Sequence, residues 1–145
     1  MIDNKIIHLF LVDDDSVFLK LLEIEFLSQG DYEVKTFSTG ELCLEHLPND
    51  TPDVIILDYH LDGIEKKAMN GMETLDKIKA FDPAIPVIML SSQDKIEVAI
   101  DCMHHAASDY VVKSETAFIR LKKIINSILG FKKIERTLNW YMDRA

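Results

Sequence analysis

The sequence predicts an α/β domain whose parallel sheet is covered by helices on both faces, and two observations support this. The apolar run Val54–Leu57 lacks the alternation of a half-exposed strand, so both of its faces are expected to be buried. Such runs alternate with helix-periodic segments about every ten to fifteen residues, as in repeated βαβ units. The chain of 145 residues, 48% of them hydrophobic, is long enough for one such domain.

Five strands and five helices are expected, each strand followed by a helix. The strands are expected at residues 6–12, 32–37, 54–58, 86–90 and 110–112. The helices are expected at residues 17–29, 41–47, 72–81 and 94–103, with a last one beginning near residue 114 or 115. Gly130 interrupts the apolar repeat of this last helix, and four apolar residues then renew it: Phe131, Ile134, Leu138 and Tyr141. We therefore expect a domain over residues 1–130, followed at 131–145 by a helical extension or the start of a linker.

Composition excludes several classes of function. The formal net charge of −9 argues against direct binding of nucleic acid and against binding to an anionic membrane surface. Cys43 and Cys102 lie in apolar, helix-like surroundings and are expected to be buried thiols in a reducing cytosol. Asp13 ends the first apolar run, and no small-residue cleavage pattern follows, so we expect neither a signal peptide nor a membrane span.

Polar side chains that could carry chemistry occur where the expected strands end. Asp58 ends the third strand, Asp13–Asp15 follow the first, Ser91-Ser92 follow the fourth and Lys113 follows the fifth. The carboxyl ends of parallel strands share one edge, which is where open α/β sheets bind ligands. Each feature also has an ordinary explanation: the acids as helix caps, the serines as turn residues and the lysine as a solvated strand end.

Together these strand ends predict a cation site. Asp13, Asp14 and Asp58 would meet around one ammonium group, that of Lys113, and this excess of negative charge favours a divalent ion. Mg²⁺, or Mn²⁺, binds carboxylates and leaves positions for water and phosphate oxygens. A central Asp could then act as a nucleophile and form an acyl phosphate, with the lysine and a serine hydroxyl binding the phosphoryl oxygens.

With these residues in place, the chain resembles the receiver domain of bacterial two-component response regulators. The resemblance spans about residues 5–128 and rests on five segments in the family's order. These segments are Leu11–Asp15, Val54–Asp58, Met69–Glu73, Pro86–Ser92 and Ala107–Lys113. The resemblance implies a flavodoxin-like, doubly wound three-layer fold with a five-stranded parallel sheet of order 2-1-3-4-5.

The resemblance also implies a phosphoryl-transfer site. Asp58 would accept a phosphoryl group from a sensor histidine kinase or a histidine phosphotransfer protein. Mg²⁺ would be held by Asp14, by Asp13 often through water, by Asp58 and by the backbone carbonyl of His60. Lys113 would pair with the phosphoryl group, or with Asp58 before modification.

A switch and two tuning positions are implied in the same way. The hydroxyl of Ser91 would move toward the phosphoryl group, and Tyr110 would turn inward, which changes the face formed by the fourth helix, fifth strand and fifth helix. His60 and Gln93 occupy the positions that tune hydrolysis of the phosphoryl group in this family. His60 could orient water there, or it could be a solvated loop residue.

The chain departs from the family's pattern at three places. The loop after Asp58 is about five residues longer than usual for such connections, and Asp62 stands where a Pro is customary. Ser114 replaces the Pro that commonly follows the lysine, so we expect Lys113 to be held somewhat differently. Ala106 replaces a Gly, which would place an alanine at positive φ or alter that turn.

We expect a cytoplasmic signalling switch and not an enzyme. A Mg²⁺-dependent phosphohydrolase is the alternative, but such enzymes typically have a second Asp two residues after the nucleophile, where this chain has His60. A degenerate interaction module is a third reading, which the complete set of pocket residues disfavours. His104 and His105 are expected to be surface residues without a third metal ligand. The spacing of apolar residues after Gly130 favours a packed helix and a possible homodimer.

Overall fold

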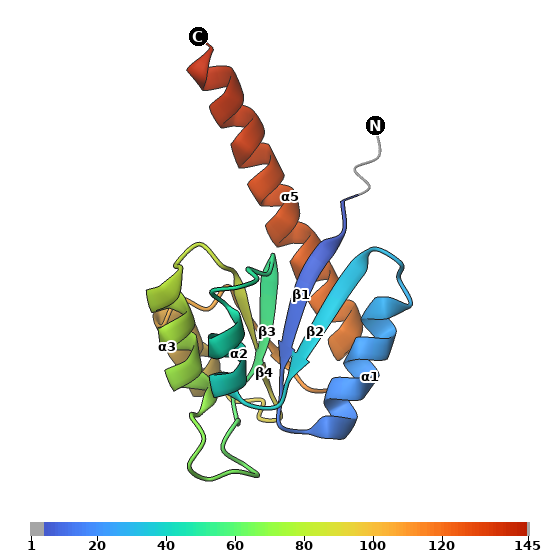
Figure 1. Cartoon of the computed structure of the whole chain (residues 1–145), viewed down its shortest axis with the longest axis vertical. Helices are drawn as coiled ribbons and strands as arrows, with labels where there is room; N and C mark the ends of the chain where they lie inside the picture. The colour runs from blue at the N-terminus through green and yellow to red at the C-terminus, as the bar shows by residue number, and fades with distance from the viewer. Residues whose placement is uncertain (1–4, 145) are drawn as a thin grey trace.

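The computed structural model describes residues 5–144 and shows a five-stranded parallel sheet between two layers of helices (Figure 1). In chain order the elements are β1 (Ile7–Val12), α1 (Ser16–Leu27), β2 (Tyr32–Phe37), α2 (Gly40–His46), β3 (Val54–Asp58), α3 (Gly71–Phe81), β4 (Val87–Ser91), α4 (Ile96–His104), β5 (Asp109–Val112) and α5 (Ala117–Asp143). The strand order is β2-β1-β3-β4-β5. The predicted fold class and strand order are therefore confirmed.

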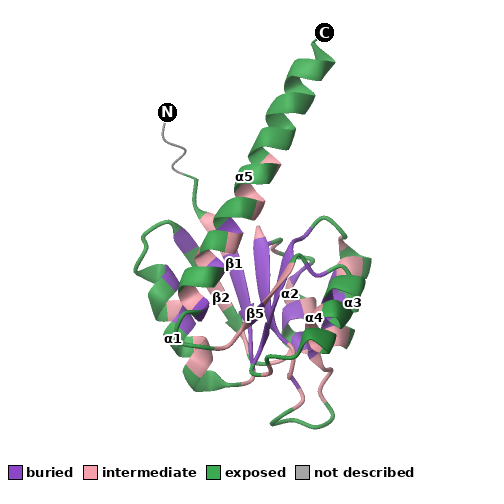
Figure 2. Cartoon of the chain, turned by 180° about the vertical axis from the view of Figure 1, so that it is seen from behind, coloured by how far each residue is buried: buried purple, intermediate pink, exposed green. Residues whose placement is uncertain are grey.

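The sheet is buried on both faces, as the unbroken apolar runs predict. All five residues of β3 are buried, and Figure 2 shows the central strands as a buried layer between exposed helices. Alternate strand residues enter two separate cores. One core is closed by α2, α3 and α4, and the other is closed by α1 and α5. Because every central side chain is used for packing, polar groups are confined to the strand ends.

Helix caps account for part of the acidic sequence after β1. The carboxylate of Asp15 accepts hydrogen bonds from the backbone N–H groups of Val17 and Phe18, so this acid caps α1. Asn70 caps α3 in the same way. The last helix begins at Ala117, slightly later than expected, after a turn in which Thr116 donates its N–H to the hydroxyl of Ser114.

The last helix does not end at Gly130. α5 continues to Asp143 because one glycine inside a helix costs only about 1 kcal/mol relative to alanine. Its last turns project beyond the domain (Figure 1), and their four periodic apolar residues, Phe131, Ile134, Leu138 and Tyr141, are 57–67% exposed. The assignment of residues 131–145 to a separate extension stays a prediction. None of the helices within residues 5–144 has the length and apolar character needed to cross a bilayer.

Backbone geometry resolves two of the expected departures. Ala106 has a φ of 70°, so the alanine adopts the left-handed conformation that a glycine would accept without strain. Across residues 5–144 no cis peptide bond occurs, so Lys113 and Ser114 are joined in trans. Cys43 and Cys102 are buried and free, as expected.

Replacing Ala106 with glycine is expected to stabilise the domain. The left-handed conformation costs a residue with a Cβ about 1–2 kcal/mol, which exceeds the entropic penalty of a glycine. We expect Ala106→Gly to raise the free energy of unfolding by about 0.5–1 kcal/mol in urea denaturation. Ala99→Gly, inside α4, is the matched control and is expected to lower it by a similar amount. A loss of stability in Ala106→Gly would contradict this account.

Candidate functional site

The strand ends bring the predicted residues to one edge of the sheet. Asp58 ends β3, the central strand of the sheet. Asp13 directly follows β1, Ser91 ends β4 and Lys113 directly follows β5. The backbone N–H of Lys113 donates to the carbonyl of Ser91 at 2.7 Å, which fixes the last strand end against its neighbour. This edge lies at the end of the domain away from the projecting part of α5 (Figure 1).

Three carboxylates form a cluster at this edge. Asp13, Asp14 and Asp58 each offer one oxygen, and these oxygens lie within 4.8 Å of one another. Asp13 and Asp58 are each only 2% exposed, whereas Asp14 is half-buried. Like charges held together out of water are costly, and a donor set made only of carboxylate oxygens fits a hard divalent cation. The predicted metal-binding side chains are thus brought together.

Lys113 is shared between two of these acids. Its ammonium nitrogen lies 2.8 Å from Oδ2 of Asp13 and 3.6 Å from Oδ2 of Asp58. The expected pairing with Asp58 is present, but Asp13 is the closer partner. The ammonium also lies 4.9 Å from the ring centroid of Phe18, a cation–π contact that the sequence did not predict because Phe18 reads only as part of a helix repeat.

The electrostatics of the cluster favour binding of a positive charge. Burial, and then the negative charge of Asp13, raise the pKa of Asp58 well above its usual range, against the opposing effects of Lys113 and the His60 N–H. Burial alone would lower the pKa of Lys113, but its hydrogen bond with Asp13 and the nearby negative charges raise it overall. The lysine therefore stays charged, and in the absence of a cation a proton competes for Asp58.

The predicted switch residues are joined through the backbone of Gln93. Ser91 is fully buried, and its hydroxyl oxygen accepts the N–H of Gln93 at 3.0 Å. The half-buried Tyr110 donates its hydroxyl to the carbonyl oxygen of the same Gln93. Gln93 was predicted as a tuning residue, but a main-chain bridge between the two switch side chains has no sequence signal.

His60 contacts the carboxylate of Asp58 through its main chain. Its backbone N–H donates to Oδ1 of Asp58 at 3.3 Å, and its ring packs edge-on against Tyr59. The ring Nε2 is buried and has no hydrogen-bond partner among residues 5–144, so the ring is not freely solvated. A role of His60 in orienting water stays a prediction. His105, in contrast, lies on the surface and pairs with Asp76 at 2.7 Å.

Gly71 supports the site in a way that sequence reasoning did not find. A Cβ at this position would lie 2.4 Å from the carbonyl oxygen of Asp58 and 2.6 Å from Cα of Tyr59. The Gly71 N–H donates to the carbonyl of Tyr59 at 3.0 Å. The glycine therefore allows α3 to begin directly against the backbone that carries Asp58. The sequence signals were the position of this glycine at the end of a long polar loop and its place in Met69–Glu73, one of the segments that resemble the receiver family.

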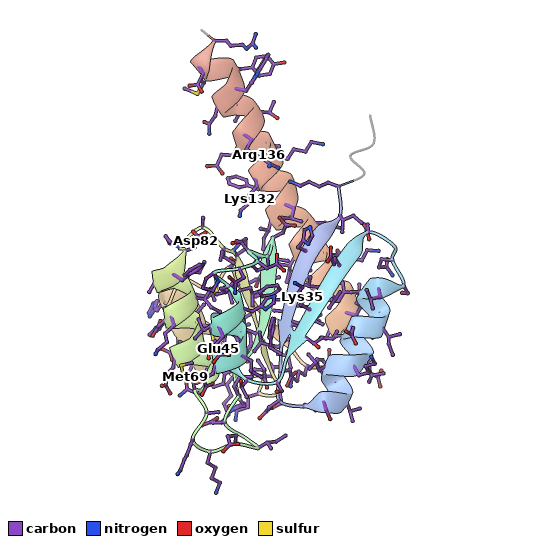
Figure 3. The ribbon with its side chains drawn as sticks, viewed as in Figure 1. Lys35, Glu45, Met69, Asp82, Lys132 and Arg136 are labelled. Carbon is purple, nitrogen blue, oxygen red and sulfur yellow. The ribbon has the colours of Figure 1, made fainter. Side chains whose placement is uncertain are left out.

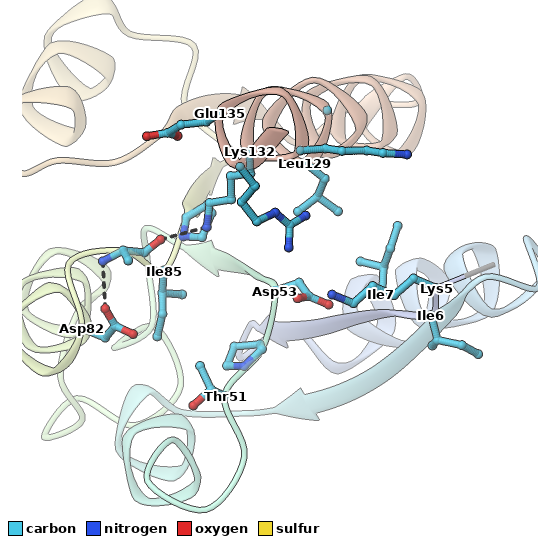
Figure 4. Close-up of a pocket in the computed structure, with 16 residues that line it drawn as sticks. Lys5, Ile6, Ile7, Thr51, Asp53, Asp82, Ile85, Leu129, Lys132 and Glu135 are labelled. Atoms are coloured by element: carbon cyan, nitrogen blue, oxygen red, sulfur yellow. Dashed lines mark hydrogen bonds between the residues drawn. The ribbon is translucent and has the colours of Figure 1, made fainter. Parts of the chain in front are cut away.

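A cavity of about 590 Å³ lies near the start of β1, away from the acidic cluster (Figure 4). Its walls come from α5 and from the start of the sheet, and they carry charges of both signs. Several of these polar groups already serve the fold. Asp53 accepts the N–H of His8 at 2.8 Å, and Lys132 donates to the carbonyl of Ala84 at 3.1 Å. The acidic cluster therefore remains the candidate site.

Comparison with known proteins decides the family. The response regulator receiver domain family matches residues 9–126 of the chain. This chain belongs to that family. The predicted resemblance is confirmed, and the matched residues include the acidic cluster, Ser91 and Lys113.

Similar proteins include regulators of several kinds. The chain is 38% identical over 125 residues to protein-glutamate methylesterase/protein-glutamine glutaminase of Bacillus licheniformis, covering 82% of this chain and 33% of the relative. It is 30% identical over 107 residues to the transcriptional regulatory protein ZraR of Escherichia coli, covering 74% of this chain and 23% of the relative. The crystal structure of NtrX from Brucella abortus superposes with a TM-score of 0.80 at 27% identity, covering 96% of this chain and 31% of that one. The receiver chain thus spans no more than about a third of these relatives.

The raised pKa of Asp58 predicts how stability depends on pH. Between the ordinary Asp pKa of 3.8 and the raised pKa of Asp58, the folded, metal-free receiver holds a proton that the unfolded chain has lost. The free energy of unfolding therefore falls as the pH rises through this range. At pH 8 we expect Asp58→Asn to be more stable than the wild type by at least about 1 kcal/mol in urea denaturation with EDTA.

Asp15→Asn is the matched control for this measurement. Asp15 is exposed, and an asparagine keeps the helix cap, so the stability of this variant should follow the wild type across the pH range. If Asp58→Asn and the wild type had the same stability at pH 8, the buried carboxylate would not carry the predicted cost.

Proposed function

We propose that this receiver is a phosphorylation-controlled switch that accepts a phosphoryl group on Asp58 in a Mg²⁺-dependent reaction. The observation that carries the proposal is the shared cluster of Asp13, Asp14 and Asp58 beside Lys113 and Ser91, with two of its carboxylates removed from water. Such a cluster is costly for the fold alone, and it supplies the nucleophile, the cation ligands and the phosphoryl partners that transfer requires.

The cation would be held by Asp13, Asp14, Asp58 and the backbone carbonyl of His60. When bound, Mg²⁺ supplies positive charge that offsets the carboxylates and the phosphoryl oxygens. A carboxylate oxygen of Asp58 would form the new O–P bond while the N–P bond of the donor's phosphohistidine breaks. The donor ring, protonated on its other nitrogen, would keep the bonding electron pair and leave as a neutral imidazole. Lys113, already within 3.6 Å of this carboxylate, would then pair with the phosphoryl oxygens.

The switch would pass from Ser91 to Tyr110 through Gln93. The hydroxyl of Ser91 accepts a hydrogen bond from Gln93 but donates none within residues 5–144, so its proton is available for a phosphoryl oxygen. Movement of Ser91 would displace the main chain of Gln93, whose carbonyl holds the Tyr110 hydroxyl. The face of α4, β5 and α5 would change as a result.

A sensor histidine kinase or a histidine phosphotransfer protein is the donor we propose, in the cytoplasm. We infer a signalling role and not turnover of a substrate. The phosphohydrolase alternative needs an acid two residues after the nucleophile, and His60 at that position contacts Asp58 through its main chain. The relatives are longer than this chain and carry further segments, so the proposal concerns the receiver itself.

Phosphoryl acceptance is tested by intact mass after incubation with acetyl phosphate and Mg²⁺. We expect the wild type to gain one phosphoryl group, about 80 Da, because Asp58 is the nucleophile. Asp58→Asn should gain nothing. Asp15→Asn, which keeps the α1 cap and lies outside the cluster, should gain the group like the wild type.

Two results would count against this function. Phosphorylation of Asp58→Asn would place the acceptor elsewhere. Continuous release of phosphate from many phosphate esters, without accumulation of the phosphorylated receiver, would favour the phosphohydrolase.

Omission of Mg²⁺ should abolish the mass gain in the wild type, since three carboxylates would then repel the donor.

We also propose that the exposed part of α5 pairs with a second copy of this chain. Its apolar residues repeat at alternating spacings of three and four, the repeat of a coiled-coil seam, and they are mostly exposed and belong to neither core of the domain. Lys132 and Arg136 project from this helix outside the repeat (Figure 3). An identical helix would cover the seam without burying these charges.

Light scattering tests this pairing. A chain truncated after Gly130, and the full chain with Leu138→Asp, should both lose the dimer and still accept a phosphoryl group, because residue 138 is far from Asp58 along an exposed helix. Asn139→Asp introduces the same charge beside the seam and is expected to keep the dimer. An unchanged molecular mass after truncation would contradict the pairing.

A further inference from the structure

The long loop between β3 and α3 reaches back to the acidic cluster. The backbone N–H of Ile64 donates to Oδ2 of Asp14 at 3.2 Å, across fifty positions of sequence. At the preceding residue, Gly63, a Cβ would lie 3.2 Å from the same carboxylate oxygen. The loop therefore places main chain, with no side chain between, directly against one of the proposed cation ligands.

The loop is anchored on both sides of this contact. Leu61 is fully buried and belongs to the core closed by α2, α3 and α4. On the other side, the N–H of Met69 donates to Oε2 of Glu41 at 3.1 Å, and Figure 3 shows Met69 where the loop returns to the helices. Ala68 donates to the carbonyl of Glu65 and closes a turn between these anchors. The contact with Asp14 is thus made by a segment of limited freedom.

The side chain of Ile64 does not explain its position. It is 77% exposed and belongs to neither core. Packing therefore does not hold residue 64 at the cluster, and the contact that the structure gives it there is the backbone hydrogen bond.

Asp14 needs such support more than the other two acids. Asp13 is held by the N–H of Asp15 at 2.9 Å and by Lys113 at 2.8 Å, and both Asp13 and Asp58 are buried. Asp14 is half-buried, and within residues 5–144 the Ile64 N–H is the hydrogen bond found on its carboxylate. Without it, this side chain would have to lose rotamer freedom when it binds a cation.

We propose that Gly63 and Ile64 form a positioning element that fixes the Asp14 carboxylate in its cation-binding orientation. The inference rests on the proposed Mg²⁺ site and adds a main-chain determinant of its affinity, supplied by the lengthened loop of this chain. The N–H occupies Oδ2, and within the described residues it leaves Oδ1 without a hydrogen bond, available to the cation. Hydrogen bonds to a ligating carboxylate typically change metal affinity by 10–100-fold.

The decisive comparison is between Ile64→Pro and Ile64→Ala. Proline removes the backbone N–H, while alanine removes most of the exposed side chain and keeps the N–H. Gly63 tolerates the restriction that a proline imposes on the residue before it. In calorimetric titrations with MgCl₂ we expect the proline variant to bind about 10-fold more weakly than the wild type and the alanine variant to bind equally well. Equal thermal unfolding of the metal-free variants would show that both are folded.

A second variant keeps the test independent of the proline. Gly63→Ala retains the Ile64 N–H but places a methyl group 3.2 Å from Oδ2 of Asp14, so it should also weaken Mg²⁺ binding. If all three variants bound Mg²⁺ with the affinity of the wild type, or if Ile64→Pro bound it more tightly, the positioning role would be overturned. The proposed function would remain intact in either case. Absence of Mg²⁺ binding by the wild type would overturn both.

Discussion

The carboxylates of Asp13 and Asp58 lie next to each other out of water, and Lys113 is the ammonium that offsets them. Two buried negative charges beside one positive charge leave a net negative charge, which either a proton or a bound cation can neutralise. The raised pKa of Asp58 corresponds to neutralisation by a proton. Because Lys113 lies closer to Asp13, it leaves Asp58 the less compensated of the two acids. The residue proposed to react is thus the one whose charge the fold offsets least.

This arrangement follows from the sheet. Its central strands are buried on both faces, so a polar side chain has a place only beyond the last packed residue of each strand. Parallel pairing then brings these positions to one edge, with β3 at the centre of the order. The opposite edge carries the mixed-charge cavity and the projecting helix. The proposed acceptor site and the surface proposed for self-association are therefore at opposite ends of the sheet.

The strands and the members of the acidic cluster could be predicted because each depends on side-chain type at a position, whereas the strand order was implied by the resemblance to the receiver family. The features that could not be predicted depend on the main chain. Gln93 bridges Ser91 and Tyr110 through its N–H and carbonyl, and Ile64 reaches Asp14 through its N–H. Every residue except proline carries these backbone groups, so the sequence contains no signal for them. The sequence left open whether residues 131–145 form a helical extension or the start of a linker, because an interruption of the apolar pattern at Gly130 need not interrupt the helix, and α5 continues through it.

The anchoring of α4 explains how a change at Asp58 could spread at low cost. Among the helices within residues 5–144, α4 has the fewest buried residues, with Cys102 alone, and its N-terminus has no side-chain cap. Elements with few buried contacts open or shift at small free-energy cost. β4 leads into α4 through Gln93, the residue whose main chain holds both switch side chains. A charge added at Asp58 would therefore act on the segment that precedes α4, while the four buried residues of α3 would keep the loop after Asp58 in place.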